Sequence, residues 1–361
     1  MINKKIGGIR IRMDKRKVLL VNDRSFTAQE MIERLEWLKE YNVEFTNFPD
    51  RPDESEGDFQ ERMLQMEVHG PSEELAPSGL IDAVKDINIL VVHFTVVPPS
   101  IIDAAKNLEF IGVLRGGWEN VDLPAASKRG IPVSNSPGRS ADAVADFTVG
   151  LMICESKNIV RSSIALRQGL WKQRYVNKNY LYNLKGKTIG LVGFGQIGSR
   201  VAKKLSGFEV NILTYDPYVS EEVIQDFGCK KTELDTLLKE SDFVSLHYRY
   251  NKGEKPIIGK RELSLMKPTA YLINTAREGL VDSDALYQAL KDRKIGGAAL
   301  DVFKTEPLPK DYPFFDLENV TLTPHLAGHS LDSMTAPFEI LGKEIERFLK
   351  GESLQFVRNQ D

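Results

Sequence analysis

A glycine-rich turn between a strand-like and a helix-like segment constrains this chain more than any other feature. Residues 188–192 have strand character, and residues 197–205 carry apolar side chains at helical spacing. Glycine occupies three positions of the intervening turn, Gly193, Gly195 and Gly198. This order of strand, turn and helix predicts a parallel α/β unit that binds an anion at the start of its helix.

Each glycine of the turn suits a separate requirement of a dinucleotide site. Gly193 suits a tight turn, Gly195 lets the backbone approach the phosphates, and Gly198 allows close packing of helix and strand. Gln196 and Ile197 begin the helix, where free N–H groups meet a bound anion. We therefore interpret the turn as the seat of a pyrophosphate.

The acid that follows the next strand indicates which cofactor is bound. The strand-like run over residues 210–215 is followed by Asp216. A carboxylate at this position hydrogen-bonds the ribose 2′-hydroxyl of NAD and repels the 2′-phosphate of NADP, so we expect NAD. The alternative is an α/β turn without a ligand. The register of strand, glycines, helix and acid favours the cofactor site.

Composition limits the class of partner. The 361 residues suggest about two domains, and 48 basic against 51 acidic residues argue against a nucleic-acid or membrane surface. A small-molecule partner fits better.

The two cysteines show no metal or disulfide spacing, so no metal is expected and a reducing compartment is favoured. We find neither a secretion signal nor a membrane-spanning run, which makes the cytoplasm the simplest location.

Alternating strands and helices predict two domains. We expect a substrate-binding domain over residues 1–140, completed by the C-terminal helical segment 332–361, and an NAD-binding domain over residues 141–331. The stretch from Pro49 to Pro77 is acidic and broken by Pro and Gly, which predicts a loop and a short exposed helix. A long helical pattern covers residues 140–169. The chain ends soon after its last helix, so no regulatory domain is expected there.

The NAD-binding domain is predicted to hold six strands in a doubly wound parallel sheet. In such a sheet, ligands bind beyond the carboxyl ends of the strands, so polar residues placed there are the first candidates. The predicted strands cover residues 188–192, 210–215, 243–246, 270–274, 297–301 and 320–323. Those of the first domain cover residues 17–21, 89–92, 109–114 and 132–134.

Three such residues form a constellation suited to hydride transfer. Arg277, Glu306 and His325 each follow a predicted strand of the second domain. Taken singly, each is more typical of an exposed charge or a turn. Together, and after a dinucleotide turn, they indicate an active site.

Several motifs in order make the chain similar to a known family, the NAD-dependent D-isomer-specific 2-hydroxyacid dehydrogenases, in the branch that includes phosphoglycerate dehydrogenase. The resemblance covers most of the chain. It implies a Rossmann NAD domain plus a flavodoxin-like α/β substrate domain, and a homodimer formed largely through the cofactor domain with the 140–169 segment as the contact. The motifs are 191–198, 266–268 running into 273–277, 301–303 followed by 306–307, and 323–325, with 120–122, 129–131 and 135–138 upstream.

The resemblance also implies roles for the constellation. Arg277 would hold the substrate carboxylate and the reacting oxygen, which suits a planar fork of donors. His325 would take the hydroxyl proton when the alcohol is oxidised and return it when the keto acid is reduced. Glu306 would bind the other ring nitrogen and so fix the tautomer.

Further positions follow from the same resemblance. Asp301 would face the nicotinamide carboxamide, and Gly116 with Gly117 would offer backbone N–H groups to the substrate carboxylate. His247, placed just after a strand, is a candidate for lining the cofactor site. The remaining candidate cofactor-binding residues are Thr275 and Ala276.

Two departures from the family pattern bear on the ligand. Arg115 stands beside the carboxylate site that the resemblance implies, where it would suit a second anion such as a phosphate. Equally, it would cap a loop or pair with Glu119. Residues 248–250, Tyr-Arg-Tyr, replace a proline-containing turn, so the adenosine side of the cofactor site is expected to differ.

The favoured function is NAD-dependent hydride transfer to or from a small D-2-hydroxy or 2-keto acid. A substrate with a second anion or several hydroxyls, phosphorylated or sugar-derived, is preferred. The alternative is an NAD(H)-binding regulator of the corepressor kind without significant turnover, which would keep the same residues. A methyltransferase would not explain the Arg, Glu and His set.

Overall fold

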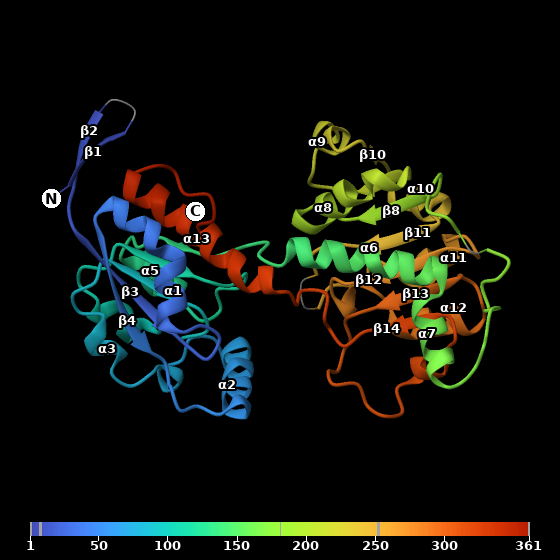
Figure 1. Ribbon diagram of the computed structural model, residues 1–361, viewed down its shortest axis with the longest axis horizontal. Coiled ribbons are helices and arrows are strands. Elements are labelled where there is room, and N and C mark those ends of the chain that lie inside the picture. The colour runs from blue at the N-terminus through green and yellow to red at the C-terminus, as the bar shows by residue number, and fades with distance from the viewer. Residues whose placement is uncertain (1, 7–8, 181, 251–252, 360–361) are drawn as a thin grey trace. The chain divides into compact units, whose positions relative to one another are not determined.

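The computed structural model describes residues 2–6, 9–180, 182–250 and 253–359. These form two compact units, each with its own core (Figure 1). The smaller unit comprises Met1–Arg139 and Met334–Asp361, and the larger comprises Ser140–Ser333. The predicted domains were 1–140 with 332–361, and 141–331.

The larger unit is built on one fully parallel sheet of seven strands, in the order β10-β9-β8-β11-β12-β13-β14. The six predicted strands are present. The seventh, β10, was missed because its two residues are both lysine, one exposed and one partly buried, and show no apolar pattern. The strands are β8 (Thr188–Val192), β9 (Asn211–Tyr215), β10 (Lys230–Lys231), β11 (Phe243–Leu246), β12 (Tyr271–Asn274), β13 (Gly297–Leu300) and β14 (Val320–Leu322).

Helices cover both faces of this sheet, which is why its central strands are continuous apolar runs. The first two helices replace the single predicted pattern over 140–169, because the backbone turns left-handed at Asn158, where φ is 54°. The helices are α6 (Ala141–Lys157), α7 (Ile159–Arg167), α8 (Gln196–Leu205), α9 (Glu221–Asp226), α10 (Leu234–Glu240), α11 (Lys260–Leu265) and α12 (Ser283–Lys291), with short 3₁₀ turns η3 (Ser206–Phe208), η4 (Glu278–Leu280) and η5 (Pro313–Asp316).

The smaller unit contains a five-stranded parallel sheet in the order β4-β3-β5-β6-β7, the flavodoxin-like order. The edge strand β4 was not predicted, because most of its side chains are partly or fully exposed and polar residues interrupt the apolar pattern. A separate N-terminal hairpin precedes the sheet. The strands are β1 (Ile2–Ile6), β2 (Ile9–Met13), β3 (Arg16–Asn22), β4 (Val43–Pro49), β5 (Ile89–Val92), β6 (Phe110–Val113) and β7 (Val133–Ser134).

Both ends of the chain build the smaller unit. Helix α13 (Leu331–Lys350) packs with α1 (Ala28–Leu35) against one face of the sheet. Gly112 permits this contact, because a Cβ atom there would lie 2.8 Å from a methyl carbon of Leu341. The other elements are η1 (Glu36–Tyr41), α2 (Glu56–His69), η2 (Glu73–Leu75), α3 (Leu80–Ala83), α4 (Pro99–Ala104) and α5 (Leu123–Lys128).

Two negative findings apply to the described residues. Each described helix is too short or too polar to cross a bilayer. Within the same residues, no group of three or more His, Cys, Asp or Glu side chains is arranged to hold a metal ion.

Candidate functional site

The glycine turn joins β8 to α8, and the geometry differs at its three glycines. At Gly193, φ is 98° and a Cβ atom would lie 2.6 Å from the carbonyl carbon of His247. At Gly198, a Cβ atom would lie 2.2 Å from the carbonyl oxygen of Gly193. Around Gly195, nothing lies within 4 Å of that position. Packing therefore demands the first and third glycines, whereas the second leaves open space beside the helix start.

The first turn of α8 suits an anion. Gly195 is its N-cap and provides no side-chain hydrogen bond, so no side chain caps the first N–H groups in the described structure. Gln196 and Ile197 begin the helix there. Unpaired N–H groups and the positive end of the helix dipole favour a phosphate at this place. The residues present thus fit the pyrophosphate of a dinucleotide.

Asp216 directly follows β9 and holds the turn in place. Its Oδ2 atom accepts a hydrogen bond from the Phe194 N–H at 2.8 Å, and its Oδ1 atom accepts from the N–H groups of Tyr218 and Val219 at 2.8 and 3.1 Å. A cleft of about 460 Å³ opens beside this carboxylate. It is lined by Gly193, Gly195, Asp216, Tyr218, His247, Tyr248, Arg249 and Glu254.

The departure at Tyr248 changes the chemistry of that cleft. Burial and the hydroxyl of Tyr218 raise the pKa of Tyr248 to about 12, so Tyr248 stays a neutral phenol. Burial lowers the pKa of His247 to about 3. The His247 Nε2 atom lies 2.9 Å from Ser245 Oγ, while its enclosed Nδ1 atom has no partner in the described structure. The cleft therefore combines the hydroxyl and imidazole groups of Tyr218, Tyr248 and His247 with the charged side chains of Asp216, Arg249 and Glu254.

Glu306 and His325 form a hydrogen-bonded pair. The distance from His325 Nδ1 to Glu306 Oε2 is 2.8 Å. The Oε1 atom of Glu306 accepts from the Phe303 N–H at 2.9 Å, which fixes the carboxylate. The backbone of His325 is left-handed, with φ of 53°, and its side chain is 51% exposed. The imidazole is thus held on one side and open to solvent on the other.

Asp301 is a buried acceptor for hydrogen bonds from residues 323–327, the segment that contains His325. It is fully buried, and its carboxylate accepts from the Thr323 hydroxyl at 2.6 Å and from the N–H groups of Leu326 and Ala327 at 2.9 Å each. These three partners flank His325. Sequence reasoning assigned Asp301 to the nicotinamide carboxamide and missed this function, although an acid directly after a buried strand was the available signal.

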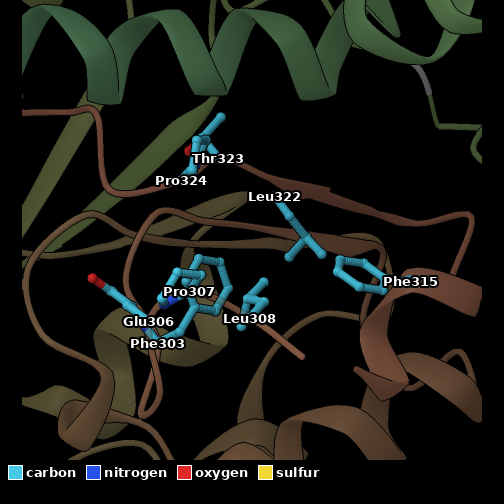
Figure 2. Close-up of a pocket in the computed structure, with 8 residues that line it drawn as sticks. All are labelled: Phe303, Glu306, Pro307, Leu308, Phe315, Leu322, Thr323 and Pro324. Atoms are coloured by element: carbon cyan, nitrogen blue, oxygen red, sulfur yellow. The ribbon is translucent and has the colours of Figure 1, made fainter. Parts of the chain in front are cut away.

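An apolar cavity of about 590 Å³ adjoins the Glu306 side of the pair. Figure 2 shows the Glu306 carboxylate directed away from Leu308 and Phe315, so the acidic group lies at the edge of an apolar wall. The lining residues are Phe303, Glu306, Pro307, Leu308, Phe315, Leu322, Thr323 and Pro324.

Arg277 is exposed just beyond β12. Asn274, almost fully buried, shapes its loop by accepting from the Ala276 N–H at 3.1 Å and donating to the Arg277 carbonyl at 2.9 Å. Within the described residues the guanidinium has no acidic partner; it donates to the Ala276 carbonyl at 2.7 Å. Thr275 is buried and hydrogen-bonds the hydroxyl of Thr148 at 2.8 Å, so Thr275 offers a ligand its backbone.

In the smaller unit, Arg115 pairs with acids. Its guanidinium lies 3.1 Å from Glu67 and 3.5 Å from Glu119, over the ring of Phe94 at 4.7 Å. Of the two sequence interpretations, the structure contains the pairing with Glu119. Glu67 comes from α2, the helix predicted to be short and exposed.

Gly116 and Gly117 keep free donors. No acceptor for either N–H is found in the described part of the chain. A Cβ atom at Gly117 would meet the flexible Glu119 carboxylate, at 2.1 Å. Asp23 and His93, which follow β3 and β5, form a buried pair that the sequence interpretation did not identify.

A Rossmann-type unit carrying Arg, Glu and His beyond its strands is typical of dehydrogenases that use NAD. Residues 149–327 match the family model described as "D-isomer specific 2-hydroxyacid dehydrogenase, NAD binding domain". The chain belongs to this family, which confirms the resemblance, the fold class and the NAD-binding domain.

Individual relatives agree on the family and differ in substrate. A D-3-phosphoglycerate dehydrogenase from Methanocaldococcus jannaschii is 39% identical over 287 residues, covering 79% of this chain and 54% of that protein, so the chain spans about half of that relative. A glyoxylate reductase from Thermofilum pendens is 44% identical over 266 residues, covering 72% and 78%. The NAD-complexed structure of a D-isomer specific 2-hydroxyacid dehydrogenase from Lactobacillus delbrueckii ssp. bulgaricus has a TM-score of 0.75, 25% identity and coverage of 95% and 100%.

Proposed function

We propose that this protein transfers a hydride between NAD and C2 of a small D-2-hydroxy or 2-keto acid. The observation that carries the proposal is the His325–Glu306 pair, 2.8 Å apart, in the same unit as a glycine turn suited to a dinucleotide. When bound, NAD supplies the hydride acceptor or donor at its nicotinamide ring.

The residues of the chain supply binding and proton transfer. Glu306 accepts the Nδ1–H of His325, which leaves Nε2 to take the hydroxyl proton in oxidation and to return it in reduction. Arg277, which has no acidic partner in the described structure, is proposed to bind the substrate carboxylate and to stabilise charge on the reacting oxygen. The free N–H groups of Gly116 and Gly117 in the smaller unit are proposed to bind a substrate carboxylate.

The cofactor preference is proposed to depend on Asp216. Its carboxylate lies in the cleft beside Gly195 and would repel a 2′-phosphate. Asp301, Thr275 and Ala276 are proposed to shape the nicotinamide side through backbone and loop structure, since their side chains are buried. A second anion at Arg115 would have to compete with two carboxylates.

A homodimer is proposed from a group of exposed apolar side chains in the larger unit. Five large apolar side chains on α7 and the following segment are about half exposed or more: Ile159, Ile164, Leu166, Leu170 and Trp171. An exposed group of this kind is typical of an interaction surface. A reducing compartment such as the cytoplasm is proposed from the two free cysteines.

The test is NADH oxidation, followed by absorbance, against a panel of 2-keto acids with and without a phosphate, a second carboxylate or extra hydroxyls, repeated with NADPH. Turnover that requires NADH and one substrate group would support the dehydrogenase. Tight NADH binding without turnover across the panel would instead favour the alternative, an NAD(H)-binding regulator.

A further inference from the structure

Two buried side chains stand at the topological switch point of the smaller sheet. Asp23 directly follows β3, and His93 directly follows β5. These strands are neighbours, whereas the next strand along the chain, β4, lies on the other side of β3. In open α/β sheets the crevice beyond such a switch point is the preferred ligand position.

The pair is held in one orientation. His93 Nδ1 lies 3.2 Å from Asp23 Oδ2, and the same carboxylate accepts from the N–H groups of Ser25 at 2.8 Å and Phe94 at 3.0 Å. Burial acts to raise the pKa of Asp23, but its hydrogen bonds, first that with His93, lower it overall. An ionised carboxylate can only accept, so Nδ1 must carry the hydrogen.

The other ring nitrogen is then a lone-pair acceptor. Burial lowers the pKa of His93 despite the opposing influence of Asp23, and the charges of Arg139 and Arg115 lower it further. The imidazole packs between Phe26 and Phe94, with ring centroids 4.9 and 4.1 Å away. Its Nε2 atom has no hydrogen-bond partner among the residues that the structure describes, and the side chain is 6% exposed.

One side chain ties this acceptor to the loop proposed to bind the substrate carboxylate. Asn120 is fully buried and donates to the carbonyl oxygens of His93 at 3.2 Å and Thr95 at 2.8 Å. Asn120 ends the segment that contains Gly116 and Gly117. The hydrogen bonds of Asn120 therefore link the backbone of His93 to the loop that carries the free N–H groups.

We infer that His93 is a specificity-determining residue whose Nε2 atom accepts a hydrogen bond from a substrate hydroxyl other than the one that reacts, with Asp23 as its positioning residue. The substrate class is a hydroxylated 2-keto or 2-hydroxy acid without a phosphate. A neutral acceptor repels a phosphate oxygen, and Arg115 already pairs with two acids. The inference rests on the proposed dehydrogenase function.

The test compares two substrates that differ by one hydroxyl, hydroxypyruvate and pyruvate, with NADH as cofactor. In the unmodified protein, kcat/KM is expected to favour hydroxypyruvate by about tenfold or more. His93→Asn keeps a donor near the Nδ1 position and removes the Nε2 acceptor. It should bring the ratio of the two kcat/KM values close to one, because hydroxypyruvate loses a hydrogen bond that pyruvate cannot make.

Further variants separate this role from a structural one. His93→Gln places an amide oxygen near the Nε2 position and should retain part of the preference. Asp23→Asn no longer fixes the hydrogen of His93 on Nδ1, so it should also lower the ratio of kcat/KM for hydroxypyruvate to that for pyruvate. This variant keeps a test available if His93→Asn fails to fold. The exposed His69 gives a matched control, since His69→Asn should leave the ratio unchanged.

Three results would overturn the inference: an unchanged ratio in His93→Asn, an equal loss for both substrates, or a preference for 3-phosphohydroxypyruvate over hydroxypyruvate that survives His93→Asn. Absence of turnover of every keto acid by the unmodified protein would contradict the proposed function itself. The two failures are therefore distinguishable.

Discussion

His325 Nδ1 lies 2.8 Å from Glu306 Oε2, and the other oxygen of that carboxylate is held by the Phe303 N–H. This arrangement fixes the imidazole tautomer, because the carboxylate accepts from Nδ1 and leaves Nε2 for proton transfer. His325→Ala should lower kcat by about 10²- to 10⁴-fold. Glu306→Gln should lower it less, since an amide oxygen can still accept. The measurement is steady-state kcat beside NADH affinity, and an unchanged kcat in His325→Ala would exclude His325 from the mechanism.

Arg277 is expected to bind substrate and not cofactor, because its exposed guanidinium has no acidic partner in the described structure. Arg277→Ala should lower kcat/KM by about 100-fold or more, as a charge-assisted bidentate contact is lost. The NADH dissociation constant from fluorescence titration should stay close to that of the unmodified protein. Arg277→Lys, which keeps the charge without the fork, should recover part of the activity. Equal loss of NADH binding and turnover would contradict the assignment.

Gly193 and Gly195 should respond differently to the same methyl group. A Cβ atom at Gly195 meets nothing within 4 Å, so Gly195→Ala should change the free energy of unfolding by about 0.5 kcal/mol or less. It should weaken NADH binding about tenfold or more, because the methyl group fills the phosphate approach. Gly193→Ala places Cβ 2.6 Å from backbone and should cost about 2 kcal/mol or more. Urea unfolding and NADH titration of both variants test this, and full NADH affinity in Gly195→Ala would argue against a pyrophosphate there.

His247 should make the protein less stable in acid. Burial lowers its pKa from 6.5 to about 3, so the unfolded chain binds the proton before the folded protein does. The contribution of His247 to the free energy of unfolding therefore rises with pH between about 3 and 6.5 and is lost as pH falls. The change is at most about 1.4 kcal/mol per pH unit. Urea unfolding at pH 7 and pH 5 should show a smaller difference in His247→Gln than in the unmodified protein. The exposed His69→Gln serves as control, and an identical pH difference in all three proteins would exclude the effect.

The proposed dimer can be tested at Trp171, whose side chain is 81% exposed. If this surface is an interface, Trp171→Asp should shift the mass in sedimentation equilibrium toward that of a monomer, because a charge would be buried against apolar side chains. Tyr218→Asp, at a similarly exposed aromatic residue outside α7, is the matched control and should not change the mass. A monomeric unmodified protein would contradict the dimer.

Sequence patterns predicted the larger unit better than the smaller one, for physical reasons. Strands buried on both faces, such as β8 and β11, are continuous apolar runs that stand out in the sequence. The edge strand β4 exposes most of its side chains and was missed for that reason. Strand β10 consists of two lysines and has no apolar residue that could mark it as a strand.

The residues of the candidate site also fall into those that local sequence could predict and those that depend on the fold. Arg277, Glu306 and His325 belong to recognisable motifs at strand ends, so local sequence was sufficient to propose them. The Asp23–His93 pair joins residues from separate strands, and the Glu67–Arg115 pair joins α2 to the segment after β6. Such pairings depend on sheet order and on a helix whose position no local pattern specifies. The hydrogen bonds that buried Asp301 accepts from Leu326 and Ala327 were likewise not predictable, because they depend on where the chain after His325 lies in the fold.

The contribution of α13 to the smaller core has a consequence for biosynthesis. Leu341 of this helix packs against Gly112, yet the whole of residues 140–333 is translated between them. The larger unit is continuous in sequence and can complete its core while the chain is still emerging from the ribosome. The smaller unit must wait with an apolar sheet face uncovered until its last helix is made. Chaperone dependence and premature termination should therefore affect the smaller unit first.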